Sequence, residues 1–436
     1  MAKYCSQILL CCYVVLFSAV STAEDALEAK IVAAVEQNMP LALQELEQSV
    51  NINSGTLNFA GVEQVGKFFQ QHFDELGFDT EWQDGSAFDR AGHLVATHLA
   101  QDPNAPKLLL IGHLDTVFAK DDTFQSFKRI DDRYVAGPGI TDMKGGNVIM
   151  VAALRALKAN GLLKHVSIKV VLTGDEERSG KPLAVSKKAL IDAAIWADIS
   201  LGFEDGDSNI KTAVIARRGA IDWELNVTGR PAHSSQIFQP EVGYGAIFET
   251  ARILNAFREQ LAGYGNLTFN PGIIVGGTSI EHKPEDASAN SFGKNNVVAK
   301  TSKVTGGIRA STPGELAHAQ QVMQKIVSEN LEHTSAVLTF SEGYPPMAPT
   351  DANRALLKQY SEVSEALGYG PVAPVNPRNA GAADISFTAE HVDMALDGLG
   401  LMGSGGHTRD EIADMTSLAK NAQKAAVLIY RLSSPE

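Results

Sequence analysis

The sequence predicts an α/β fold in which a mostly parallel sheet is flanked by helices and interrupted by a smaller α+β domain. In the first half of the chain, short apolar runs alternate with helical stretches, which is typical of a parallel sheet. Near residue 212 the pattern changes to longer alternating strands and two helices. Their order, β-α-β-β-α-β, resembles a ferredoxin-like unit. At 436 residues the chain is long enough for two domains.

Residues 1–23 are predicted to be a secretory signal peptide. Lys3 supplies the positive charge, residues 8–20 are apolar, and Ser21 to Ala23 have the small residues of a cleavage site. The apolar run is short for a membrane span, and a retained N-terminal anchor is the alternative. We therefore expect a secreted or periplasmic protein with no membrane contact after signal cleavage.

The cysteines restrict the chemistry of the mature chain. All three, Cys5, Cys11 and Cys12, lie in the leader. The mature chain then needs no disulfide, and any metal must be held by His, Asp and Glu, which suits zinc, manganese or cobalt. The formal net charge of −14 argues against nucleic acid as a partner.

The larger, catalytic domain is expected over residues 24–212 and 344–436. Apolar periodicity predicts its helices, and short apolar runs predict its strands. Gly77 is expected to end the second helix. The predicted elements are helix 24–50, helix 62–76, strand 78–82, strand 93–99, strand 108–111, helix 147–158, strand 166–173, helix 184–192, strand 199–203 and helix 352–367.

The inserted lid or dimerisation domain is expected over residues 213–343. Pro313 near a first helical turn supports the start of its second helix. The predicted elements are strand 213–227, helix 244–262, strand 267–275, strand 297–309, helix 313–330 and strand 336–341.

Acidic and imidazole side chains follow several of the buried strands. His113 and Asp115 follow the strand at 108–111, the Glu176–Glu177 pair follows 166–173, and Glu204 follows 199–203. Open α/β sheets bind ligands at the carboxyl ends of their strands. Asp115 is placed to orient the His113 imidazole, an arrangement common at metal-bound histidines.

Three further segments complete a hypothetical two-metal hydrolytic site. Asp142 lies in a glycine-rich loop before a buried helix and could bridge two metals, although a helix N-cap is the alternative. Glu177 is the expected ligand and Glu176 the expected general base, whereas a solvated acidic pair is the alternative. His407 stands in a second glycine-rich loop. His233 lies in a turn of the second domain. Read in isolation, it is expected to be an ordinary histidine without a role in the site.

Six motifs in this order resemble the zinc metallopeptidase family of carboxypeptidase G (glutamate carboxypeptidase), aminoacylase, acetylornithine deacetylase and succinyl-diaminopimelate desuccinylase. The resemblance covers nearly all of the mature chain and implies a zinc-exopeptidase fold with an inserted lid. It is closest to the carboxypeptidase branch. The motifs are Gly112-His-Leu-Asp-Thr-Val117, Thr141-Asp-Met-Lys-Gly-Gly146, Gly174-Asp-Glu-Glu177, Phe203-Glu204, Gly229-Arg-Pro-Ala-His233 and the loop of His407.

The resemblance implies a role for each metal-site residue. His113 and Glu204 would bind one zinc, and Glu177 and His407 the other. Asp142 would bridge the two ions. The remaining roles follow the same pattern: Asp115 would orient His113, Glu176 would be the catalytic base, and His233 would reach across a dimer interface to polarise the scissile carbonyl.

Three segments depart from the family pattern, and they concern the pocket for the substrate carboxylate. These segments read Asn296-Val-Val-Ala299, Ala380-Gly-Ala-Ala-Asp384 and Gly343-Tyr-Pro-Pro346. Asn296 and Arg309 match lid positions that contact substrate in the family. Arg309 and Arg378 are the arginines expected to hold a substrate carboxylate, because a guanidinium can bind it through two hydrogen bonds.

The expected function is that of a homodimeric exopeptidase with two Zn²⁺ per subunit, Co²⁺ or Mn²⁺ being possible substitutes. It would hydrolyse an amide bond in a small peptide and release a C-terminal amino acid, as glutamate carboxypeptidase does. One alternative is an N-acyl-amino-acid deacylase of the aminoacylase type. Another is a non-catalytic binding protein on the same fold, against which the presence of Glu176 argues.

Overall fold

A computed structural model describes the backbone of residues 2–284 and 288–433, with side chains from residue 25 onward. The predicted leader, residues 1–23, therefore lies outside the part of the chain with described side chains. The described residues form two compact units, unit 1 (residues up to 215, 350–375 and from 388) and unit 2 (216–349 and 376–387). The segment 376–387, assigned above to the catalytic domain, groups with unit 2. Arg217 donates to the carbonyl of Gly381 there, and the Tyr344 hydroxyl donates to Asp384.

The main sheet of unit 1 has six strands in the order β1-β2-β6-β3-β7-β16. β3 pairs in parallel with β6 and β7, and β7 with β16, whereas β1 and β2 are antiparallel. This confirms the prediction of a mostly parallel sheet. The strands are β1 (Asp79–Asp84), β2 (Gly92–His98), β3 (Lys107–His113), β6 (Ser167–Thr173), β7 (Ile199–Gly202) and β16 (Met394–Leu396).

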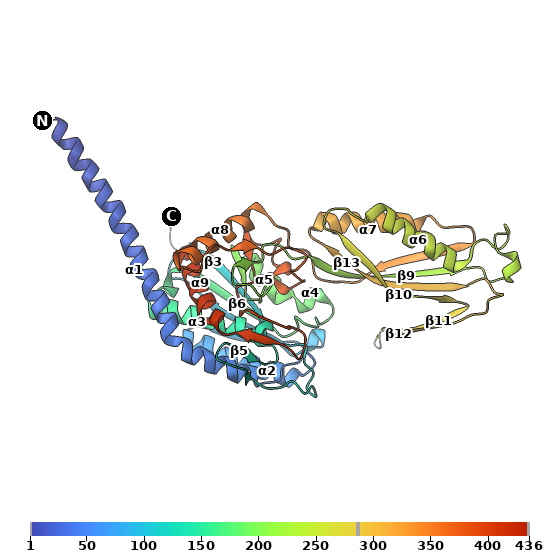
Figure 1. Cartoon of the computed structure of the whole chain (residues 1–436), viewed down its shortest axis with the longest axis horizontal. Helices are drawn as coiled ribbons and strands as arrows, with labels where there is room; N and C mark the ends of the chain where they lie inside the picture. The colour runs from blue at the N-terminus through green and yellow to red at the C-terminus, as the bar shows by residue number, and fades with distance from the viewer. Residues whose placement is uncertain (1, 285–287, 434–436) are drawn as a thin grey trace. The chain divides into compact units, whose positions relative to one another are not determined.

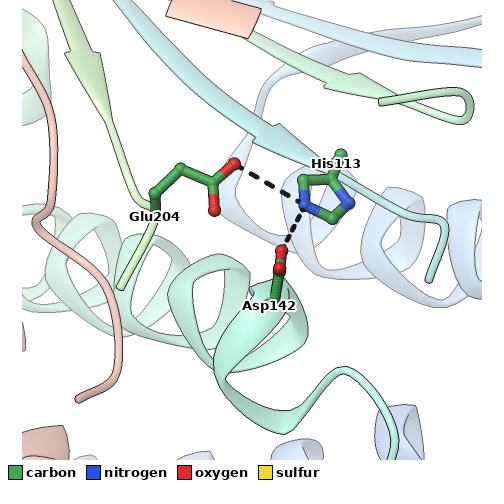
Figure 2. Close-up of side chains that lie close together, drawn as sticks. All are labelled: His113, Asp142 and Glu204. Carbon is green, nitrogen blue, oxygen red and sulfur yellow. Dashed lines mark hydrogen bonds and ion pairs between the residues drawn. The ribbon is translucent and has the colours of Figure 1, made fainter. Parts of the chain in front are cut away.

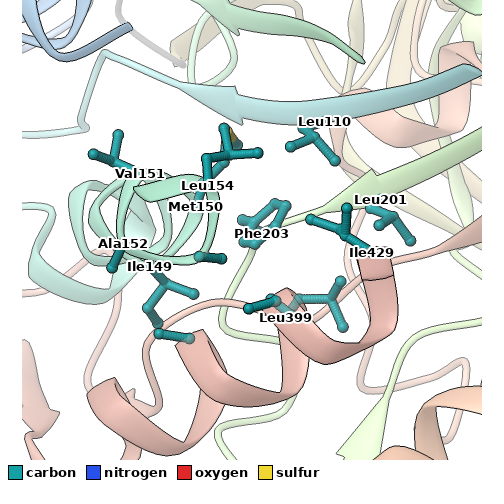
Figure 3. Packing of buried hydrophobic residues seen from close by; sticks show 14 of the residues in the cluster. Leu110, Ile149, Met150, Val151, Ala152, Leu154, Leu201, Phe203, Leu399 and Ile429 are labelled. Carbon is teal, nitrogen blue, oxygen red and sulfur yellow. The ribbon is translucent and has the colours of Figure 1, made fainter. Parts of the chain in front are cut away.

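Helices flank this sheet, and α3 is buried almost all round, as its apolar sequence predicts. Figure 3 shows why: side chains of α3, such as Met150 and Leu154, face Leu110 of β3 on one side and Ile429 of α9 on another. Gly77, with φ of 86°, ends α2 as expected. The helices are α1 (Ala2–Val50), α2 (Phe59–Leu76), α3 (Gly145–Ala159), α4 (Leu183–Ser186), α5 (Lys188–Trp196), α8 (Asp351–Ala366) and α9 (Thr416–Ser433).

A small antiparallel sheet in unit 1, β17-β18-β5-β4, carries the loop of His407. That loop connects two neighbouring strands, and β18 pairs directly with β5, which precedes the glycine-rich loop of Asp142. Two loops that are far apart in the sequence are thereby anchored side by side. The strands are β4 (Lys128–Arg129), β5 (Tyr134–Ala136), β17 (Gly403–Ser404) and β18 (Ile412–Asp414).

Unit 2 contains the predicted ferredoxin-like unit. Its antiparallel sheet has the order β10-β13-β9-β14, and helices α6 and α7 cover one face of it (Figure 1). Alternate residues of β9 (Trp223, Leu225 and Val227) are buried beneath the helices. The elements are β9 (Gly219–Gly229), α6 (Gly245–Leu261), β10 (Thr268–Gly277), β13 (Thr301–Ala310), α7 (Pro313–Ser328) and β14 (Thr334–Phe340).

Three local features differ from the sequence-based expectation. The first strand of the lid begins at Gly219 and not at 213, because β8 (Thr212–Ala213) pairs in parallel with β15 (Ala373–Pro374) of unit 1. The helix expected at 184–192 is divided into α4 and α5. An additional hairpin, β11 (Ser279–Lys283) and β12 (Ser288–Phe292), follows β10. Among the residues whose side chains are described, no helix has the length and apolar character needed to cross a membrane.

Candidate metal centre

The carboxylate of Asp142 lies between two imidazoles of unit 1. Its Oδ1 is 2.9 Å from Nε2 of His113, and its Oδ2 is 2.9 Å from Nε2 of His407. Each oxygen therefore faces a different histidine. The N-cap role considered for Asp142 is not adopted, because α3 begins after Lys144 and shows no side-chain cap bond.

The first group of ligand atoms comprises His113, Asp142 and Glu204 (Figure 2). Nε2 of His113 is 3.6 Å from Oε1 of Glu204. The two residues meet because β3 and β7 are parallel neighbours, and His113 ends β3 while Glu204 follows β7. The side chain of Asn147 at the start of α3 donates to the backbone carbonyl of His113 at 2.6 Å and holds the strand end in place.

The second group comprises Asp142, Glu177 and His407. Nε2 of His407 is 3.1 Å from Oε2 of Glu177, which follows β6 on the other side of β3. His407 has φ of 62° and a side chain that is 59% exposed, so it approaches the buried carboxylates from the solvent side.

The electrostatics of the two groups show how strongly these carboxylates attract positive charge. Burial, and then the charge of Asp142, raise the pKa of Glu177 to about 7. Hydrogen bonds to Asp142 and Glu177 raise the pKa of His407 to about 11. For His113 the largest effect is burial, which lowers the pKa, but its carboxylate partners outweigh this and raise the pKa well above its usual value. The protonated imidazoles thus supply positive charge to the neighbouring carboxylates, and a bound metal cation could supply this charge in their place.

The donor set fits two divalent cations. Each group offers one imidazole nitrogen, one carboxylate of its own and one oxygen of the shared Asp142, and within a group the atoms lie within 4.8 Å of one another. Imidazole and carboxylate ligands without thiolate suit zinc, and also manganese or cobalt. All five residues that the sequence analysis assigned to the metals are brought together.

Asp115 is buried beneath this centre and contacts both sides of it. Nδ1 of His113 is 3.0 Å from the backbone carbonyl oxygen of Asp115 and 3.4 Å from its Oδ1. The same carboxylate accepts the backbone N–H groups of Glu176 and Glu177 at 3.0 and 3.2 Å and the hydroxyl of Thr56 at 2.6 Å. Asp115 therefore also positions the segment that carries the expected base, a function that sequence reasoning missed.

Glu411 is a second positioning residue that sequence reasoning missed. Its buried carboxylate accepts the backbone N–H groups of Gly139, Thr141 and Asp142 at 2.9 to 3.3 Å. It thereby ties the loop of His407 to the loop of Asp142. The position of Glu411 at the end of the glycine-rich His407 segment could have indicated a role at the site. Nothing in the sequence, however, indicates which backbone groups it contacts.

Comparison with known proteins agrees with this geometry. Residues 109–431 match the family model "Peptidase family M20/M25/M40". The chain belongs to this family. It is therefore related to metal-dependent peptidases and amidohydrolases, and the family recognised from the six motifs is confirmed.

Two curated relatives of this M20 chain match over most of their length. Carboxypeptidase G2 of Pseudomonas sp. (strain RS-16) is 24% identical over 410 residues, which cover 92% of this chain and 91% of the relative. Succinyl-diaminopimelate desuccinylase of Magnetococcus marinus is 26% identical over 390 residues, which cover 84% of this chain and 92% of the relative.

Solved structures of M20-type peptidases share the fold. Aminopeptidase PepT of Bacillus cereus superposes with a TM-score of 0.71 at 21% identity, covering 90% of this chain and 98% of that one. YXEP of Bacillus subtilis, described as a dinuclear metal-binding peptidase of the M20 family, superposes with a TM-score of 0.62 at 14% identity. The match covers 92% of this chain and 98% of that one. These likenesses confirm the fold, an α/β domain with an inserted lid.

The remaining predicted residues of this M20 chain lie in unit 2, in two places. His233 is exposed, with Nδ1 2.8 Å from the Ser235 hydroxyl, and the next residue, Ser234, donates its backbone N–H to the carbonyl of Asn296. Arg309 lies at the other end of the sheet, near the end of β13. Arg378 lies in the segment 376–387, and its charge and that of Arg309 both lower the pKa of Arg218, after the larger effect of burial.

Proposed function

We propose that this M20 chain is a dinuclear zinc exopeptidase that hydrolyses an amide bond and releases a C-terminal amino acid. The observation that carries the proposal is the placement of Asp142, whose two carboxylate oxygens each face one imidazole, with Glu177 and Glu204 completing two separate ligand groups. His113, Glu204 and Asp142 would hold one ion, and Glu177, His407 and Asp142 the other. Bound there, the cations would activate water and polarise the scissile carbonyl.

Glu176 is the proposed general base. It neighbours the ligand Glu177, and its backbone N–H donates to Asp115. The backbone from which its side chain extends is therefore held beside the two groups of metal ligands. It would take a proton from the attacking water and deliver it to the leaving amine. Positioned proton transfer of this kind is typically worth about 10²–10⁴ in rate.

The substrate is proposed to carry a free carboxylate. Arg309 and Arg378 make no side-chain hydrogen bond or ion pair within the described part of the chain, so both guanidinium groups are available to an anion. The similarity to a carboxypeptidase over 92% of this chain favours peptide substrates. The similarity to a desuccinylase supports the second candidate, an N-acyl-amino-acid deacylase with the same centre.

A homodimer is proposed from the surface beside His233. Ser234 and Ile237 line one groove with Tyr244, Ile247 and Phe248. Ile247 and Phe248 are 52% and 50% exposed and lie next to each other at this groove, which suits a contact with a second copy. Export by cleavage of the predicted signal peptide also remains our proposal.

Turnover in the presence of zinc tests the function directly. The purified mature chain, supplied with zinc, is expected to cleave one class in a panel of dipeptides and N-acyl amino acids, and to lose activity with a chelator. Glu176→Gln is expected to retain two zinc ions per chain, counted by elemental analysis, yet to lose nearly all kcat. Glu81→Gln, on β1, serves as the control and should behave like wild type.

The proposal fails in two recognisable ways. If zinc-loaded protein hydrolyses no member of the panel, the exopeptidase assignment is wrong. If Glu176→Gln retains full kcat, the centre can still be catalytic, but Glu176 is not its base.

A further inference from the structure

The backbone around Glu204 is held by the segment 397–400, which follows β16. The carboxylate of Asp397 accepts the backbone N–H of Glu204 at 3.3 Å, and the carbonyl of Glu204 accepts the N–H of Gly400 at 2.8 Å. Leu399 donates its N–H to the carbonyl of Gly202, the last residue of β7, at 3.2 Å. The two segments meet because β7 and β16 are parallel neighbours. Glu204 is thus bound through both its N–H and its carbonyl.

Asp397 is itself held firmly in place. It is fully buried, and its Oδ1 also accepts the backbone N–H of Gly398 at 2.7 Å. Its own backbone forms two hydrogen bonds with Val214, at 2.7 and 2.9 Å. An ionised acceptor makes shorter and stronger hydrogen bonds than a neutral one. The Asp397 carboxylate is therefore suited to fix the peptide N–H of Glu204.

Gly202 provides the space that the Asp397 carboxylate occupies. A Cβ at position 202 would lie 2.3 Å from Oδ1 of Asp397 and 2.5 Å from its Cγ. Atoms that are not bonded to one another cannot approach so closely, so a larger residue at 202 would displace the carboxylate. The absence of a side chain at the end of β7 is thus what allows Asp397 to reach the backbone of Glu204.

The contact of Asp397 concerns only one of the two groups of metal ligands. Glu204 belongs to the group that also contains His113, and its carboxylate faces the His113 imidazole (Figure 2). Glu411, by contrast, holds the loop of Asp142, which belongs to both groups. A change at Asp397 should therefore affect the two groups unequally, whereas a change at Glu411 should affect both.

We propose that Asp397 is a positioning residue that sets the zinc affinity of the group with His113 and Glu204, and not that of the group with Glu177 and His407. This inference rests on the proposed dinuclear centre. When the backbone N–H of Glu204 loses its acceptor, the ligand carboxylate is no longer held in the geometry that the cation requires. Residues that orient a metal ligand typically change metal affinity by about 10- to 100-fold.

Stepwise zinc binding to the full chain tests the proposal, measured by competition with a chromogenic chelator. We expect Asp397→Ala to weaken one of the two zinc affinities by about tenfold or more and to leave the other unchanged. Glu204→Gln and His407→Ala, which each remove a ligand of one group, assign the two affinities. Adding Asp397→Ala to Glu204→Gln should have no further effect on zinc binding. Adding it to His407→Ala should weaken the remaining zinc by the same factor as before.

Further variants separate positioning from a general loss of structure. Gly202→Ala, which displaces the carboxylate without removing it, should weaken the same zinc. Asp397→Asn retains an acceptor oxygen and should restore most of the affinity that Asp397→Ala loses. Asp198→Ala is the control, because Asp198 lies before β7 at its other end and accepts the N–H of Lys107 at 2.9 Å. It should bind both zinc ions as the wild type does.

Equal weakening of both zinc ions in Asp397→Ala would overturn the proposal, since it would indicate a general loosening of unit 1. Unchanged zinc binding in Asp397→Ala would also overturn it. If circular dichroism shows that Asp397→Ala does not fold, Gly202→Ala takes its place under the same criteria. A wild type that binds fewer than two zinc ions would refute the dinuclear centre itself. Two zinc ions in the wild type without a selective loss would refute only the role of Asp397.

Discussion

Oε1 of Glu411 lies 2.9 Å from the backbone nitrogen of Thr141, the residue before the proposed bridging ligand. Glu411 also accepts hydrogen bonds from the backbone N–H of Gly139 and from the hydroxyl of Thr141. It therefore fixes the position of the loop that carries Asp142. Residues that orient metal ligands commonly affect metal affinity without contacting the ion.

Glu411→Gln is expected to weaken zinc binding. The amide cannot accept hydrogen bonds on its nitrogen side, so at least one backbone N–H of the loop loses its partner. We expect a loss of about 10- to 100-fold in zinc affinity, measured by competition with a chromogenic chelator. Asp410→Asn, at the exposed neighbour, is the control. Equal zinc affinities in the two variants would show that the loop does not depend on Glu411.

The buried pair Lys187–Asp175 is expected to be a stability determinant of unit 1. The two groups lie 2.8 Å apart with no exposed surface, and Asp175 also accepts from Ser186 and from the backbone of Gly180. Lys187→Met would leave a buried carboxylate without its cation, which typically costs about 3–5 kcal/mol. Urea unfolding followed by circular dichroism measures the effect.

The controls for this pair separate charge from packing. Lys188→Met removes an exposed partner of Asp192 and should cost less than about 1 kcal/mol. The double variant Lys187→Met with Asp175→Asn should recover part of the loss. If the double variant is as unstable as Lys187→Met alone, the unpaired charge is not the cause.

Lys424 is expected to make stability depend on pH. Burial, and then the charge of Lys420, lower its pKa from 10.5 to about 7. Between these pH values the unfolded chain binds more protons than the folded one, so stability should increase from pH 7 toward pH 10. The increase is at most about 1.4 kcal/mol per pH unit from one group.

Lys424→Met should reduce the increase of stability with pH. It should also raise the midpoint temperature of unfolding at pH 7, where burial of the charged amine destabilises the wild type most within this range. Thermal unfolding at pH 7, 8, 9 and 10 measures it, with exposed Lys120→Met as the control. The buried amine donates to the carbonyl of Ile210 at 2.9 Å. If that bond outweighs desolvation, Lys424→Met will be less stable at pH 7, and the expectation is refuted.

His233 is expected to act in the active site of a partner subunit. It lies beside the exposed apolar groove proposed as the dimer surface, in a lid that carries none of the metal ligands. His233→Ala and Glu176→Gln should each be inactive alone. In mixed dimers one site has an intact base and receives His233 from the other subunit, so random mixing should restore roughly a quarter of wild-type activity. Verified mixed dimers without activity would contradict action in trans.

Much of this architecture was predictable because it depends on local patterns. Apolar runs predicted the strands β3, β6 and β7, and the residues after them provided three of the four segments around Asp142. Gly77 predicted the end of α2. These inferences needed only the periodicity of helices and strands and the rule that parallel strands end at a common edge.

Contacts between distant segments were not predictable. Glu411 and Thr141 are separated by 270 residues, and no local pattern pairs a carboxylate with particular backbone N–H groups. The hydrogen bond from Arg218 to the hydroxyl of Thr268 likewise joins two separate segments. The hairpin β11–β12 was missed because its short strands are polar and show no apolar alternation.

By itself, the sequence determined the fold class, the family and the residue types able to hold two cations, since these follow from periodicity and from motifs a few residues long. Only the tertiary structure decided how those residues face one another, with Asp142 between two imidazoles and Asp115 in contact with both His113 and the backbone of Glu176 and Glu177. The physical reason is that hydrogen bonds and ion pairs depend on distances of a few ångströms between atoms. Chain folding, and not sequence proximity, sets those distances.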